Sequence, residues 1–229
     1  GKAGAKAWWL GRPRLTEGQE GKALALTGLD DWWECDQLPA LDITGDALTL
    51  SAWVQPTGWH ATNHFITKGN DQYGLVQHHQ DSLTFFVGTN QKHSLTVEVP
   101  YDWNFKWHHI AGIYDGQHIK IWMDSLVLAE KPVSGNIQSN RWTVSSGRSM
   151  ANFGEKYTSR TGNFLIDQAA IYDLAVSGQE INSGKKPEPV AHFDFDTVYK
   201  QGNFHYYGMG YGSVDGLVMA ERRLQSVAL

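Results

Sequence analysis

The sequence predicts an all-β fold, a sandwich or jelly roll of two antiparallel sheets with one short helix. Apolar and polar residues alternate with a period of two in several segments between residues 46 and 173. Turn-forming clusters separate these segments at short intervals, which favours antiparallel strands over a parallel α/β sheet. The chain also has 10 Trp, 9 Tyr and 9 Phe in 229 residues, a composition typical of β structure and of surfaces that stack on flat ligands.

Each alternating segment is expected to form a strand with one buried side, because successive side chains of a strand point to opposite faces. In DALTLSAWV, residues 46–54, the apolar side chains at the even positions share one face, and Thr49, Ser51 and Trp53 share the other. The same pattern recurs in SLTFFVG (82–88), HSLTVEVP (93–100) and HIKIWMD (118–124).

Turn and helix signals agree with this pattern. Asp115-Gly116 lies between two of the strands and predicts a two-residue hairpin turn. Ser177 and Glu180 have the S-x-x-E spacing of a capping box, which predicts a short helix after the strand FLIDQAAIYDLAV. VAHFDFD, residues 190–196, alternates again and is expected to be a last strand that closes the sandwich.

Composition limits the classes of function. The net charge of −5 argues against a broad basic surface for nucleic acid or anionic lipid. No apolar run approaches the roughly 18 residues of a membrane span. Cys35 is the only cysteine, so an internal disulfide is excluded. The chain starts with GKAGAKAWW rather than Met, which favours a piece of a longer protein.

Five segments identify a family resemblance. GKALALTGLDDWWEC, LTLSAWVQP, HFITKGNDQYGL, WHHIAGIYDGQHIKIWMD and GNFLIDQAAIYDLAVSGQEI follow one another between residues 20 and 182. They resemble successive blocks of laminin-G-like or pentraxin-like domains, which are concanavalin A-like jelly rolls. The resemblance implies such a sandwich over residues 1–198. The sequence departs from the family at Asp124-Ser125, where an Asp-Gly turn is usual.

The last residues, 199–229, resemble a different family. DGLVMAER, residues 215–222, is similar to a segment near the end of the catalytic barrel of family 2 glycoside hydrolases, the β-galactosidase-like enzymes. Asp215 and Glu221 depart from the Asn and Asp that are usual there. The resemblance implies an irregular tail that belongs to such a barrel, and a sandwich inserted in or attached to the enzyme. The catalytic domain of that parent chain would be its partner.

Catalysis by this chain itself is not expected. Glycoside hydrolysis needs two carboxyl groups across the scissile bond. Glycanases that share the fold carry Glu-x-Asp-x-x-Glu; Glu34 and Asp36 match its first two positions, but Pro39 replaces the third acid. The catalytic glutamates of a β-galactosidase-like parent would precede Gly1.

A structural calcium ion is implied by the jelly-roll resemblance, because such folds often hold one with carboxylates and main-chain carbonyls. The candidate ligands are Asp30, Asp31 and Asp167, and Asp194 and Asp196 would join them if the last strand folds back. The alternative is a solvated turn with an Asp that hydrogen-bonds the backbone. The pairs His78-His79 and His108-His109 are poor metal sites, since neighbours on a strand face opposite sides.

A carbohydrate site needs flat aromatic rings beside short polar groups. One candidate set is Trp59, His60 and Asn63, and another is Trp142 and Arg148. Trp53 and Trp122 lie on the polar faces of their strands and are further candidates for a ligand surface.

Three functions follow from these observations. The first is a non-catalytic carbohydrate-binding domain that holds a galactoside-containing glycan near a β-galactosidase-like active site. The second is a structural insertion that shapes the rim of that site or a subunit contact. The third, a free-standing glycanase, lacks the acid triad. We expect the first, with export to the periplasm or cell surface suggested by the parent type.

Overall fold

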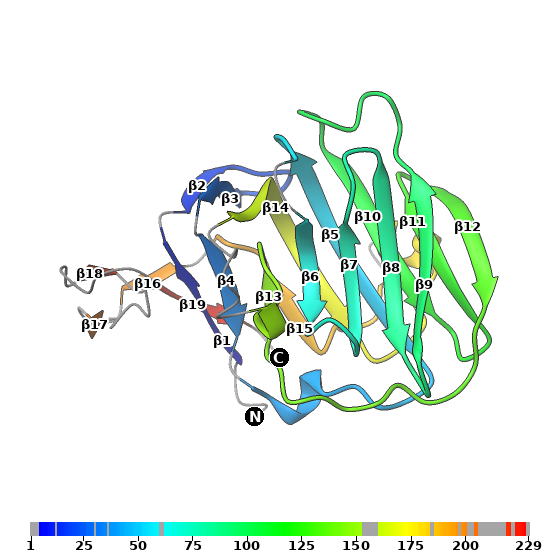
Figure 1. The fold of residues 1–229 in the computed structure, drawn as a ribbon. Helices are drawn as coiled ribbons and strands as arrows, with labels where there is room; N and C mark the ends of the chain where they lie inside the picture. The colour runs from blue at the N-terminus through cyan, green and yellow to red at the C-terminus, as the bar shows by residue number, and fades with distance from the viewer. Residues whose placement is uncertain are drawn as a thin grey trace.

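The computed structural model describes residues 5–11, 13–29, 31–35, 37–59, 62–152, 160–183, 186–196, 198–200, 204–205, 219–220 and 223–227. Within these ranges, two large sheets of antiparallel strands pack face to face (Figure 1). The predicted all-β sandwich is therefore confirmed. In the same ranges, we find no helix with the length and apolar character that a membrane span requires.

The two sheets are called sheet A and sheet B. In spatial order, sheet A comprises β16 (Val198–Lys200), β19 (Arg223–Val227), β1 (Ala5–Leu10), β4 (Trp32–Cys35), β13 (Val144–Ser146), β6 (Asn63–Lys68), β7 (Tyr73–Gln77), β8 (Ser82–Gly88) and β9 (Lys92–Glu98). Sheet B comprises β12 (Leu126–Pro132), β11 (His118–Met123), β10 (His108–Tyr114), β5 (Leu48–Pro56), β14 (Arg160–Tyr172), β3 (Lys22–Leu29) and β2 (Arg14–Glu17), and β15 (Ala191–Phe193) pairs with β14.

The remaining described elements are short. They are the antiparallel pair β17 (Phe204–His205) and β18 (Met219–Ala220), the 3-10 helices η1 (Pro39–Leu41) and η2 (Met150–Asn152), and the α-helix α1 (Gly178–Asn182). The predicted capping box of α1 is confirmed. Ser177 Oγ accepts a hydrogen bond from Glu180 N–H, and the Glu180 carboxylate accepts one from Ser177 N–H.

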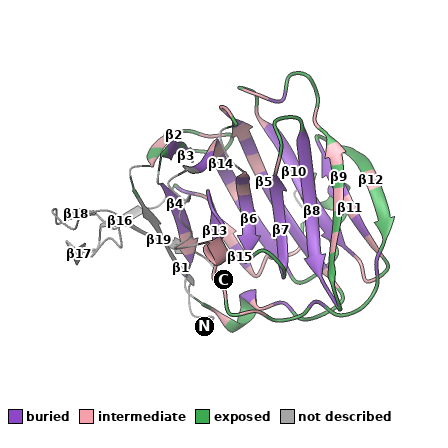
Figure 2. Cartoon of the chain, viewed as in Figure 1, coloured by how far each residue is buried: buried purple, intermediate pink, exposed green. Residues whose placement is uncertain are grey.

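The main core lies between the sheets. Figure 2 shows the central strands of both sheets buried and the outer strand β12 exposed. Leu50 of β5, Phe85 of β8 and Ile121 of β11 have no exposed surface. These are residues that the period of two assigns to the inner faces, so the alternation identifies the core correctly.

The outer face of sheet B is covered as well, which the alternation does not predict. Thr49 and Ser51 are 0% and 2% exposed, although they lie on the polar side of β5. A second apolar cluster explains this, because Val176 and Ile181, next to and within α1, pack on the outer side of sheet B. Trp122 is 2% exposed beneath the same helix, and it is not part of an open ligand surface.

The segment after α1 returns to the sandwich. β15 pairs with β14 through Ala169 and Phe193, so VAHFDFD supplies a closing strand as expected. Further along, β19 pairs with both β1 and β16. The backbone of β19, which belongs to the predicted tail of residues 199–229, thus forms part of sheet A.

Candidate functional site

Loops from different parts of the chain meet at one end of the sandwich. They are residues 57–59, 78–81 and 99–107, which follow β5, β7 and β9. Phe105 N–H donates to the carbonyl oxygen of Pro56 at 2.7 Å, and Val99 N–H donates to that of Asp81 at 3.0 Å. These bonds join the loop after β9 to the end of β5 and to the loop after β7, and the loop after β9 projects beyond the sheets at the top of Figure 1.

Aromatic side chains on these loops are open to solvent. Trp59 is 36% exposed, Tyr101 107% and Phe105 70%. We call these three residues the aromatic rim. Large rigid rings that bury area on contact are energetically effective binding groups, and soluble proteins seldom leave several exposed together without a function.

The backbone of Phe105 supports a binding role for the rim. Its φ of 63° is rare for a bulky residue and costs about 1–3 kcal/mol. The conformation is held by the bond to Pro56 and by Gln55 Nε2, which donates to the Phe105 carbonyl oxygen at 2.9 Å. Trp103 anchors the loop, since it is 1% exposed and packs edge-on against Phe65. The loop therefore buries one ring and presents Tyr101 and Phe105 outward.

Of the described residues of the first predicted sugar set, Trp59 lies on the rim and Asn63 does not. The ring of Trp59 lies 6.3 Å from that of His79, whereas His60 is outside the described residues. Asn63 is fully buried; its Nδ2 donates to Gln77 Oε1 and Gly58 O, and its Oδ1 accepts from Asn163 N–H. Asn63 thus supports the loop from below and offers no free group to a ligand.

The second predicted set, Trp142 and Arg148, flanks β13. The Trp142 carbonyl oxygen accepts a hydrogen bond from Lys68 Nζ at 2.7 Å. Arg148 is 6% exposed; its guanidinium lies 4.9 Å from the centre of the Trp32 ring and donates to Asn152 O. Because this guanidinium is buried against protein groups, the structure gives Arg148 a packing role. The prediction that either residue binds sugar remains a prediction.

Of the acids of the predicted calcium site, the two that the structure describes, Asp31 and Asp167, are not brought together. Asp31 is fully buried and accepts hydrogen bonds from Thr27 N–H, Thr27 Oγ1 and Thr161 Oγ1. Asp167 follows Thr161 by six residues on β14, which corresponds to roughly 20 Å of extended strand. Asp30 lies outside the described residues.

Asp167 instead lies beside the turn between β2 and β3. Its Oδ2 accepts hydrogen bonds from Gln19 N–H at 2.8 Å and Glu20 N–H at 3.0 Å. Burial and, to a lesser extent, the charge of Asp196 raise the pKa of Asp167 to about 6, although the backbone hydrogen bonds to the carboxylate act to lower it. Asp196 reaches this turn because β15 folds back onto β14. The Oδ1 atom of Asp196 accepts a hydrogen bond from Lys22 N–H. Asp167 and Asp196 are therefore close enough to interact electrostatically, although no group of three or more His, Cys, Asp or Glu side chains among the described residues is arranged to hold a metal ion.

We predict that millimolar calcium raises the melting temperature of the wild-type protein through this pair. Asp196→Asn removes one charge but keeps an acceptor for Lys22 N–H, and it should abolish the rise. Asp31→Asn, which changes a distant buried acid, should keep it. Thermal unfolding in calcium and in a chelator measures the effect. An equal rise in wild type and Asp196→Asn, or none in wild type, contradicts the assignment.

One buried polar network contains the residue types of a catalytic site. His109 Nε2 lies 2.9 Å from Ser51 Oγ, and His109 Nδ1 lies 2.9 Å from Asn182 Oδ1. This geometry is that of a nucleophile, a base and an orienting group. Ser51 is however only 2% exposed beneath α1, so a substrate cannot reach it. The network fastens the end of α1 to sheet B, because His109 bonds Ser51 and Asn182, which lie 58 and 73 residues away in the chain.

Comparison with known proteins supports the fold. The model of the concanavalin A-like lectin/glucanases superfamily matches residues 36–182. No curated protein sequence matches the chain. The first part of the sequence resemblance is thereby confirmed, whereas the resemblance of the tail to family 2 glycoside hydrolases finds no such match and remains a prediction.

Solved structures show the same sandwich at low sequence identity. The binding domain of botulinum neurotoxin DC in complex with SialylT has a TM-score of 0.59 at 12% identity, over 78% of this chain and 45% of that one. The binding domain of botulinum neurotoxin serotype C1 has a TM-score of 0.60 at 15% identity, over 78% and 46%. This chain thus spans less than half the length of those chains, and the likeness shows the fold alone.

A third structure is matched over most of its length. Domain 4 of AbnA, a GH43 extracellular arabinanase from Geobacillus stearothermophilus, was solved in complex with arabinotriose. Its TM-score is 0.54 at 18% identity, over 73% of this chain and 78% of that domain.

Proposed function

The chain belongs to the concanavalin A-like lectin/glucanases superfamily, and from this premise we propose that it is a non-catalytic carbohydrate-binding domain. The aromatic rim carries the proposal. Trp59, Tyr101 and Phe105 expose their rings at one end of the sandwich, and the strained Phe105 is fixed by hydrogen bonds to the end of β5. Such rings stack on the apolar face of a sugar, while nearby polar groups bond its hydroxyls.

The proposal extends to the setting of the domain. A glycan-binding role within a larger glycoside hydrolase is supported by domain 4 of the arabinanase, which holds arabinotriose and belongs to a longer enzyme. The segment DGLVMAER favours a β-galactosidase-like parent in particular. On this basis the ligand is a galactoside-containing glycan, with an arabinose oligosaccharide as the competing candidate.

Replacing the rim should remove glycan binding without unfolding the domain. We choose Trp59→Ala, Tyr101→Ala and Phe105→Gly in one chain, because glycine adopts the positive φ of position 105 without strain. Each lost ring contact is worth about 0.5–1.5 kcal/mol, so affinity should fall by roughly tenfold or more. Galactotriose and arabinotriose are titrated by calorimetry against wild type and variant.

The matched control is Leu174→Ala, which truncates another exposed apolar side chain outside the rim. It should bind as wild type does, and circular dichroism should show all three proteins folded. If neither sugar nor any other trisaccharide binds wild type, the proposed function is wrong. If binding survives in the rim variant at full affinity, the rim is not the site.

A structural insertion is the second candidate, and one observation favours it. The outer strand β12 exposes Leu126, Val127 and Leu128 at 66%, 58% and 39%. An apolar edge strand of this kind suits contact with the rest of a parent enzyme. On this reading the domain binds no sugar, and the calorimetry above is flat for every ligand.

A further inference from the structure

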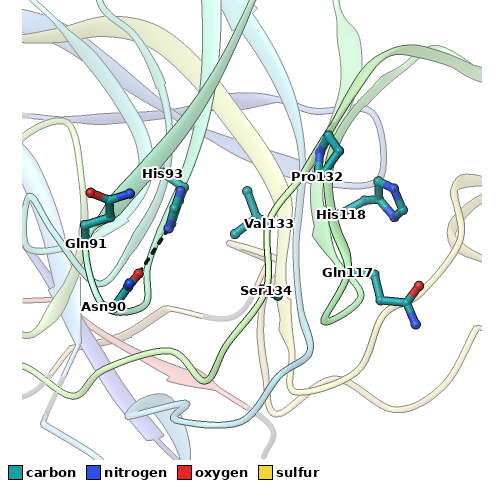
Figure 3. Close-up of a pocket in the computed structure, with 8 residues that line it drawn as sticks. All are labelled: Asn90, Gln91, His93, Gln117, His118, Pro132, Val133 and Ser134. Atoms are coloured by element: carbon teal, nitrogen blue, oxygen red, sulfur yellow. Dashed lines mark hydrogen bonds between the residues drawn. The ribbon is translucent and has the colours of Figure 1, made fainter.

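At the end of the sandwich opposite the rim lies a groove of about 540 Å³, within the range of roughly 300–1,000 Å³ that is common for small-molecule sites. The turns after β8 and β10 and the segment that ends β12 surround it. Its lining residues are Asn90, Gln91, His93, Gln117, His118, Pro132, Val133 and Ser134. Figure 3 shows Asn90, Gln91 and His93 on one side, Gln117 and His118 on the other, and Val133 and Ser134 between them.

Several polar side chains that line the groove have donors or acceptors without a hydrogen-bond partner among the described residues, and an apolar side chain lies beside them. Within the described part of the chain, the side chains of Gln91, Gln117 and Ser134 make no hydrogen bond, and Asn90 uses only its oxygen, toward Thr89 Oγ1 and His93 Nε2. Val133 is 5% exposed and forms part of the wall toward the core. Amide and hydroxyl groups donate and accept together, which is what neighbouring hydroxyls of a sugar require.

The chemistry of the lining selects a class of ligand. The lining contains no Asp, Glu, Lys or Arg, so no charge within it attracts an ionic group. It contains no Phe, Tyr or Trp either, and its flat rings are the two imidazoles of His93 and His118, so it lacks the large aromatic surface that is proposed to stack on sugar at the rim. A neutral oligosaccharide bound through its hydroxyls satisfies both conditions, and an amide-lined groove recognises it without a flat apolar face.

We propose that this groove is a second glycan-binding site, which takes a neutral oligosaccharide through Gln91, Gln117 and the neighbouring amide and hydroxyl groups. The inference depends on the proposed function only in that the ligand is a glycan. β8 and β10 each run the length between the two ends with seven residues, so the sites are about 23 Å apart. One long polysaccharide can then bind both sites at once, or two separate oligosaccharides can bind one site each. When one polysaccharide binds both sites, its second contact is intramolecular, which raises the overall affinity.

Nuclear magnetic resonance separates the two sites in one protein. Galactotriose and arabinotriose are titrated into 15N-labelled wild type while the indole N–H signal of Trp59 and the side-chain amide signals of Gln91 and Gln117 are followed. The double variant Gln91→Ala/Gln117→Ala identifies the amide signals by their loss. Both glutamines lie in exposed turns and use only backbone atoms in hydrogen bonds, so the variant should fold.

We expect saturable shifts of the glutamine amides in wild type and in the rim variant. The double variant should keep the Trp59 response and bind one equivalent fewer of the trisaccharide in calorimetry. Gln37→Ala, which removes an exposed glutamine outside the groove, should leave both responses unchanged. A Trp59 shift with unmoved glutamine amides overturns the second site and leaves the proposed function intact. If neither the Trp59 signal nor the glutamine amide signals shift, both the second site and the proposed function are wrong.

Discussion

The free energy of unfolding is expected to fall by roughly 3 kcal/mol between pH 7 and pH 4 through His64 alone. His64 lies on β6, where burial and, to a lesser extent, the charge of His78 lower its pKa to about 3. Its folded pKa is thus below the unfolded value, and the unfolded chain takes up the proton first. The contribution is fully present above the ordinary histidine pKa and is lost as the pH falls toward 3.

Urea unfolding of wild type and His64→Asn at pH 7 and pH 4 measures this contribution. Asparagine can still donate to Thr62 O, the partner of His64 Nδ1 at 3.2 Å, but it does not titrate. The raised pKa of Asp167 acts in the opposite sense, because protonation below about 6 stabilises the fold, and it is common to both proteins. The loss on acidification should be about 3 kcal/mol smaller in the variant. Equal losses would show that His64 is not the acid-sensitive group.

The sequence predicts the two sheets well because a period of two depends on local geometry alone. Leu50, Phe85 and Ile121 fall on inner faces that every alternating strand must bury. The pattern does not say what covers the other face. Ser51 is buried because α1, which lies more than 120 residues later in the chain, packs over sheet B. Long-range packing of that kind leaves no trace in the alternation.

The candidate site is predicted less well for the same reason. Trp59 is found from its loop composition, but Tyr101 and Phe105 are missed, although the sequence PYDWNF places an aromatic residue at every second position. Their exposure depends on the bond from Phe105 to Pro56, 49 residues earlier, and on the burial of Trp103 between them. No local signal distinguishes the anchored ring from the two exposed ones.

The predicted acids illustrate a third limit. Family resemblance groups Asp31 with Asp167, yet each is held by a different part of β14 or the turn beside it. The companion of Asp167 is Asp196, which arrives through the closing segment after β15. The sequence allows Asp194 and Asp196 to join the group if the last strand folds back, but which acid lies beside Asp167 depends on tertiary closure, which no local pattern measures.

Trp33→Ala is expected to cost about 4 kcal/mol, because removing a buried indole leaves a large cavity. Trp33 is 1% exposed in β4 of sheet A, and its ring lies 4.4 Å from that of Phe193 and 6.2 Å from that of Phe195. These two rings come from the closing segment, residues 190–196, so the cavity in the variant forms where that segment packs against sheet A. Denaturant unfolding at pH 7 measures the loss.

Trp33→Phe is the matched control, since the Trp33 indole N–H has no hydrogen-bond partner among the described residues and a phenyl ring refills much of the space. It should cost less than half as much as Trp33→Ala. Hydrogen exchange adds a local readout: the amides of residues 191–193 should lose protection in Trp33→Ala more than those of β8. Because Asp196 follows this segment, loosening it should also weaken the calcium effect on melting. Uniform loss of protection across both sheets would mean that Trp33 holds the whole core and not the closing strand in particular.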